Sequence, residues 1–241
     1  PREPARRGLR ERQVRVTDVA RDEYQRTLDD LRADVCEMGE STLSQFDRGL
    51  DALETNDETL AREVIDGDDV INERYLALES DCVDLLALQQ PVASDLRFVT
   101  ASFKIITDLE RVADLATNFA RYSTSAESHS LQTVDVAAIG DVASDQVRAA
   151  LDAYADADAE AARTVADRDD EVDALCQRAS ERVVRDLIED EAGGDAWAVE
   201  RLMDDVSRLL LTVRDLERVG DHAVNIAART LYMVENDPEL I

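Results

Sequence analysis

The chain has 241 residues, and its 55 Asp and Glu against 27 Lys and Arg give a formal net charge of −28. Nucleic acid and anionic membrane surfaces would repel such a chain, so both are excluded as direct partners. Lys104 is the only lysine. Excess acid with so little lysine indicates a cytoplasmic protein from an organism that lives in high salt, such as a halophilic archaeon. An ordinary acidic mesophilic protein is the alternative. No apolar run is long enough to span a bilayer, so contact with a membrane is expected only through partners.

The segment 1–15, PREPARRGLRERQVR, is rich in arginine and has no apolar stripe. We expect a flexible, disordered tail here, with contact to an acidic partner as the alternative. From residue 16, apolar residues recur at steps of three and four as far as residue 54, which predicts a long amphipathic helix. Cap-type residues at 55–57 precede a second predicted helix over 58–89. Pro91 suits the first turn of a third helix that runs to about residue 122.

The polar stretch STSAESHS, 123–130, is the predicted domain boundary, between a first domain at 16–123 and a second at 131–236. The second half repeats the plan, with helices predicted over 133–156 and 159–191. After GGD (193–195), a last helix is predicted to run to about residue 235. We therefore expect an all-α fold of six long helices in two tandem, pseudo-symmetric three-helix bundles.

Two stretches of the first half recur in the second. DLERVADLATNFA (108–120) and DLERVGDHAVNIA (215–227) are identical at nine of thirteen positions. VIDGDDVIN (64–72) similarly matches VADRDDEVD (165–173). The repeats indicate that the two bundles arose by duplication.

Each repeated helix carries acids four residues apart, which places them on one helical face. Asn118 and Asn225 are expected to continue these faces. If each predicted second helix packs against its third, two sets of four oxygen ligands form. The first set is Asp68, Asn72, Glu110 and Asp114, and the second set is Asp169, Asp173, Glu217 and Asp221.

Such a set is unfavourable without a counter-ion, because like charges raise each other's pKa. A bound cation removes that repulsion, and hard oxygen ligands suit magnesium, calcium, manganese or iron, with zinc also admitted. Two alternatives remain open. Acid pairs four apart are common in so acidic a chain and mostly face solvent, and Arg111 and Arg218 offer the acids ordinary ion pairs.

An enzyme is not expected. Di-iron bundle enzymes use Glu-x-x-His motifs, and neither His129 nor His222 follows a glutamate three residues earlier. Phosphate-binding loops, nucleophile-elbow motifs and Cys–His constellations do not occur in the sequence.

Four stretches, VIDGD followed by an asparagine, LQQPVASDLR, KIITDLERVADLATN and LLTVRDLERVGDHAVNIA, resemble the PhoU family of phosphate-transport accessory and regulatory proteins. The likeness extends in order over nearly the whole chain after the arginine-rich segment. It implies two three-helix bundles, each with a multinuclear iron or zinc cluster held by the acid pairs. Asn72 stands where the second repeat has Asp173, and Ala113 stands where it has Gly220. Because asparagine is a neutral donor, we expect the first site to hold metal less tightly.

The resemblance also implies a function and partners. The protein would regulate phosphate uptake and homeostasis by contact with the cytoplasmic ATPase of the phosphate ABC transporter and, in bacteria, with a phosphate-sensing histidine kinase. It leaves a homodimer open. The alternative is an acidic helical scaffold with incidental metal binding and no role specific to phosphate.

Overall fold

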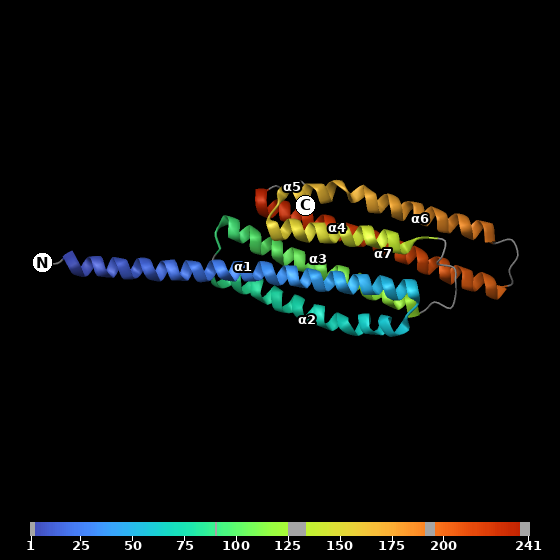
Figure 1. Ribbon diagram of the computed structural model, residues 1–241, viewed down its shortest axis with the longest axis horizontal. Helices are drawn as coiled ribbons and strands as arrows, with labels where there is room; N and C mark the ends of the chain where they lie inside the picture. The colour runs from blue at the N-terminus through green and yellow to red at the C-terminus, as the bar shows by residue number, and fades with distance from the viewer. Residues whose placement is uncertain (1–2, 90, 125–133, 191–195, 237–241) are drawn as a thin grey trace.

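The computed structural model describes residues 3–89, 91–124, 134–190 and 196–236, with no side chains described at 3–20, 188–190, 196–199 and 201. Seven helices lie in these ranges (Figure 1). The first half contains α1 (Glu3–Thr55), α2 (Glu58–Leu88) and α3 (Ala93–Thr124). The second half contains α4 (Val136–Asp156), α5 (Ala159–Asp167), α6 (Asp169–Asp190) and α7 (Ala196–Glu235).

The prediction of two three-helix bundles is confirmed, with one change. The helix predicted over 159–191 is divided at Arg168 into α5 and α6. Arg168 has φ −93° and ψ 3°, and its N–H bonds back to Val165 and Ala166. The acids Asp169 and Asp170 follow at once, and a negative charge favours the start of a new helix.

The start of the first helix also differs from the prediction. The sequence predicted a helix from residue 16, whereas α1 begins at Glu3. The arginine-rich segment therefore continues α1 as helix, and in Figure 1 this end of α1 extends past the other helices. A helix needs no apolar stripe, and Ala, Arg, Glu, Gln and Leu all have high intrinsic helix propensity.

Equivalent turns join the first and second helices of the two halves. Asp57 caps α2 by accepting hydrogen bonds from two backbone N–H groups of its first turn, and Asp158 caps α5 in the same way. Each cap follows a residue with positive φ, Asn56 at 52° and Ala157 at 51°. The predicted cap at 55–57 is thus confirmed, and the duplication extends to the geometry of the turn.

The two bundles share one hydrophobic core. A single cluster of buried side chains runs from Leu28 on α1 to Met233 on α7 and includes the inner faces of both repeated helices. The repeated helices α3 and α7 pack against each other, as do α1 and α4, and each pair runs antiparallel (Figure 1). The halves are thus related by an approximate two-fold axis. Among the described helices, none has the length and apolar character to cross a membrane.

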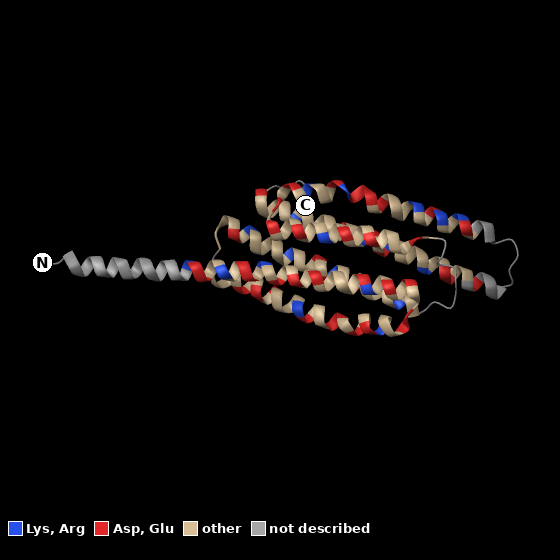
Figure 2. Cartoon of the chain, in the orientation of Figure 1, with Lys and Arg blue, Asp and Glu red and all other residues tan. Residues whose placement is uncertain are grey.

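Acidic residues lie along all seven helices, and basic residues occur singly among these acidic residues (Figure 2).

Candidate functional site

The second set of acids lies along the contact between α6 and α7. Asp169 and Asp173 come from α6, where the buried Val172 and Cys176 pack into the core beside them. Glu217 and Asp221 come from α7, which packs against α6. The predicted facing of these helices is therefore confirmed, and it follows from the apolar positions that each pair flanks.

Electrostatics shows that these four carboxylates influence one another. Burial raises the pKa of Asp169, and the charges of Asp173 and Asp221 raise it further. Burial also raises the pKa of Glu217, again with added repulsion from Asp173 and Asp221. Carboxylates that lie close together and partly buried raise one another's pKa in this way.

The nearby arginines bind other acids. Arg218 pairs with Asp215 at 3.6 Å, and Arg168 pairs with Glu171 at 2.9 Å. Among the described residues, no ion pair involves any of the four acids of the second set. Their donor chemistry, four carboxylates with no ion pair to a described basic residue, fits a hard cation.

The first set lies between α2 and α3 and is already compensated. Arg111 pairs with Glu110 at 3.5 Å and with Asp114 at 3.6 Å. Asp68 accepts hydrogen bonds from Gln45 and Asn72, both at 3.0 Å. In the first set, Glu110 and Asp114 therefore form the ordinary ion pairs with arginine that the sequence analysis left open as an alternative.

Two pKa values of the first set are raised, as in the second set, but here arginine opposes the rise. Burial raises the pKa of Glu110, Asp114 raises it further, and Arg111 opposes the shift. Burial and Asp68 raise the pKa of Asp114, while Arg111, Arg121 and Arg218 lower it. His222 on α7 also lowers the pKa of Glu110. Its counterpart in the other repeat is the buried Leu115, so the second set has no equivalent basic neighbour.

A closed coordination shell is not present in either set: within the described part of the chain, no three Asp, Glu, His or Cys side chains converge closely enough to hold a metal ion. The predicted ligands therefore face one another on neighbouring helices without forming a ready-made metal cage.

Helix packing gives a reason for the glycine at position 220, where the other repeat has Ala113. A Cβ built on Gly220 would lie 3.3 Å from Cγ1 of Val172, so the missing side chain lets α7 approach α6 closely. Ala113, at the matching position of α3, is buried and keeps its methyl group. The two acid sets therefore differ in the small residue beside them as well as in their charge.

Asn118 and Asn225 lie on the predicted faces, but each bonds to the other bundle, which the sequence analysis did not predict. Asn118 donates a hydrogen bond to Asp215 at 3.1 Å, and Asn225 donates one to Asp108 at 3.3 Å. Each asparagine thus reaches the first residue of the other repeat. The helical spacing predicted the face of each asparagine correctly, but the packing of α3 against α7 directs both side chains to the opposite bundle.

Asp108 and Asp215 form polar contacts between the two bundles that the sequence analysis missed. His222 lies 2.9 Å from Asp108, and the Tyr122 hydroxyl donates to Asp215 at 2.9 Å. Burial and the bond to Asp215 raise the pKa of Tyr122 to about 12. The sequence did contain a signal for these two positions, because both repeated stretches begin with an aspartate that is followed by a leucine.

Comparison with known proteins supplies the family. A family model described as the PhoU domain matches residues 35–123 and 136–230, one match in each bundle. The chain is 35% identical to a phosphate-specific transport system accessory protein PhoU homologue of Pseudomonas aeruginosa, over 88% of this chain and 85% of that protein. A homologue from Methanothermobacter thermautotrophicus is 32% identical over 88% of this chain and 94% of its own length.

Solved structures agree with the sequence comparison. The crystal structure of PhoU from Pseudomonas aeruginosa superposes with a TM-score of 0.77 at 33% identity, covering 89% of this chain and all of that one. The phosphate transport system regulatory protein PhoU from Streptococcus pneumoniae gives a TM-score of 0.78 at 25% identity, covering 89% and 98%. The likeness therefore extends over both bundles.

Proposed function

The chain belongs to the PhoU family, and we propose that it regulates phosphate uptake and phosphate homeostasis by contact with the cytoplasmic ATPase of a phosphate ABC transporter. The observation that carries this proposal is the match of both bundles to accessory proteins named for phosphate transport. Regulation by contact, without catalysis, and a cytoplasmic location form part of the proposal. A phosphate-sensing histidine kinase would be the partner in those organisms that have one.

We further propose that the second set binds a transition-metal ion or cluster, iron or zinc. Support comes from four mutually repelling carboxylates that form no ion pair with a described basic residue. The ligands would be Asp169, Asp173, Glu217 and Asp221. Bound metal would offset the repulsion among the four carboxylates and reduce the negative charge of this part of the protein.

Elemental analysis tests the metal proposal on protein purified without a metal-affinity tag. We expect bound iron or zinc in the wild type and strongly reduced metal in Glu217→Gln/Asp221→Asn. Asp141→Asn/Asp145→Asn is the matched control, because these acids have the same spacing on an exposed face of α4. Wild-type protein free of transition metal would refute the proposal.

A pull-down against the transporter ATPase, with and without phosphate, tests the regulatory proposal. We expect binding that depends on phosphate and that the α4 control variant retains. The Glu217→Gln/Asp221→Asn variant shows whether the contact needs metal. Failure of the wild type to bind under either condition would favour the acidic scaffold.

A further inference from the structure

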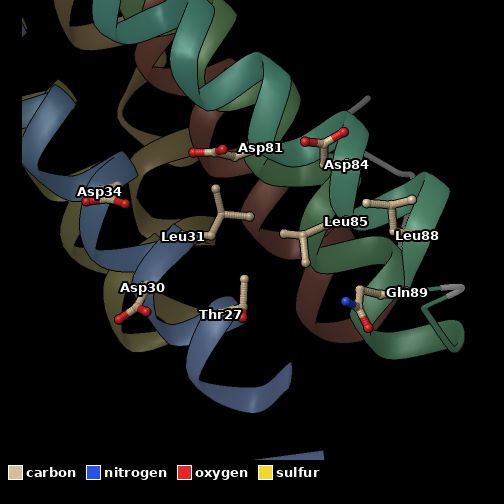
Figure 3. Close-up of a pocket in the computed structure, with 9 residues that line it drawn as sticks. All are labelled: Thr27, Asp30, Leu31, Asp34, Asp81, Asp84, Leu85, Leu88 and Gln89. Carbon is tan, nitrogen blue, oxygen red and sulfur yellow. The ribbon is translucent and has the colours of Figure 1, made fainter. Parts of the chain in front are cut away.

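A pocket of about 270 Å³ lies between α1 and α2 (Figure 3), toward the end of the bundle where α1 extends past the other helices (Figure 1). Leu31 and Leu85 form its floor and point toward one another from the two helices. Four aspartates line its rim, two from each helix: Asp30, Asp34, Asp81 and Asp84.

The pocket combines negative charge with exposed apolar surface. All four rim aspartates are exposed, and none forms an ion pair with another described residue. Leu88 lines the same pocket and is 73% exposed, and nearby Val92, just beyond the end of α2, is 69% exposed. A ligand that matches this surface carries several positive charges and some apolar groups.

One segment of the chain has this chemistry. Residues 2–16 contain six arginines against two glutamates, together with Leu9, Val14 and Val16, in a chain whose net charge is −28. The segment also lies outside the region that the PhoU family model matches. Its arginine content therefore calls for an explanation specific to this chain.

The segment cannot reach the pocket of its own molecule. α1 is one continuous helix from Glu3 to Thr55, and Thr27 lines the pocket. At 1.5 Å per residue, the last arginine of the segment, Arg15, lies about 18 Å further along the helix axis, and the rest of the segment lies further still. An arginine-rich segment that fills this pocket must therefore come from another molecule.

We propose that the arginine-rich segment of a second copy of this chain occupies the pocket between α1 and α2. Two copies related by a two-fold axis near residue 20 would place their α1 helices antiparallel, so that each segment lies over the other copy's pocket. Each copy then gives its segment to the pocket of the other copy, so both contacts form at once and the assembly stops at a dimer. Arginine suits this role because its guanidinium binds carboxylates through two parallel hydrogen bonds.

The proposal predicts that two different groups of substitutions weaken dimerisation of the full-length chain. One is Arg6→Glu/Arg7→Glu/Arg10→Glu in the segment, and the other replaces the four rim aspartates by asparagine. We expect the dimer dissociation constant, measured by sedimentation velocity, to rise about tenfold or more for each. Circular dichroism checks that both variants stay helical.

The asparagine variant separates specific docking from general repulsion. Removing four negative charges lowers the net repulsion between copies, which by itself would strengthen association. The proposal predicts the opposite sign. The matched control replaces four exposed aspartates of α4, Asp141, Asp145, Asp152 and Asp156, by asparagine, and its dissociation constant should stay equal or fall.

Mixing supplies an independent check. The segment variant keeps an intact pocket and the pocket variant keeps an intact segment, so a mixed dimer retains one of the two contacts. We expect the mixture to associate more tightly than either variant alone. A wild type that remains monomeric, or a dimer that neither variant weakens, would overturn the proposal.

Discussion

Tyr122 on α3 donates its hydroxyl hydrogen to the fully buried carboxylate of Asp215 on α7, at 2.9 Å, across the junction of the two bundles. Asn118 donates to the same carboxylate, and Arg214 and Arg218 lie beside it. A buried charge is tolerated only when it is fully hydrogen-bonded and paired. This contact therefore holds the two repeated helices in one register.

Tyr122→Phe should destabilise the fold, because it removes one hydrogen bond from a buried carboxylate that water cannot reach. A hydrogen bond to a charged group contributes about 1.5–3 kcal/mol, and we expect a loss in that range in urea unfolding. Tyr75→Phe is the control, since Tyr75 packs only partly buried against the core, and it should change stability by less than about 0.5 kcal/mol. Equal effects of the two variants would contradict the role assigned to Tyr122.

Gly49→Ala should destabilise the first bundle, although alanine is the better helix former. A Cβ on Gly49 would lie 2.6 Å from the backbone oxygen of Ala116, where α1 crosses α3, and a backbone atom cannot rotate away. Overpacking of this kind costs about 1–3 kcal/mol. Gly67→Ala on α2 meets nothing within 4 Å and should instead gain about 0.5–1 kcal/mol. Thermal unfolding of both variants measures the difference in sign.

Metal-free protein should gain stability from the second set as the pH falls through the raised folded-state pKa values toward the ordinary values of 3.8 for Asp and 4.5 for Glu. The folded-state pKa values of Asp169 and Glu217 are raised. Their contribution is therefore fully present below the unfolded pKa and is lost as the pH rises through the folded pKa. Glu217→Gln should flatten this dependence and stabilise the protein slightly at pH 7.

Glu171→Gln provides the control for that pH series. Glu171 pairs with Arg168 in the first turn of α6, where a negative charge is favourable. Its replacement should slightly destabilise the protein at pH 7. If both substitutions shifted stability in the same direction, repulsion within the second set would not explain the pH dependence.

Metal should bind to the second set more tightly than to the first. A cation entering the first set must displace Arg111 from Glu110 and Asp114 and must compete with the hydrogen bonds from Gln45 and Asn72 to Asp68. Isothermal titration with zinc of Asp114→Asn and Asp221→Asn separates the sites. We expect the larger loss of affinity in Asp221→Asn, and a larger loss in Asp114→Asn would reverse the assignment.

The sequence by itself determined most of the helices, their order and the facing of the acid pairs, but it predicted neither the break at Arg168 nor the helix that begins at Glu3. Helical periodicity fixes which residues share a face, and the apolar positions beside Glu110 and Glu217 fix which face turns inward. The caps at Asp57 and Asp158 are equally local, because the side chain bonds to backbone two or three residues away.

The tertiary structure alone decided which partner each polar side chain takes. Arg111 and Arg218 occupy equivalent positions in identical DLERV stretches, yet Arg111 pairs with the acids of the first set and Arg218 pairs with Asp215. Asn118 and Asn225 lie on the predicted faces but bond to the opposite bundle. The register of α3 against α7 sets these choices, because it brings together residues about 100 positions apart whose distances no local pattern encodes.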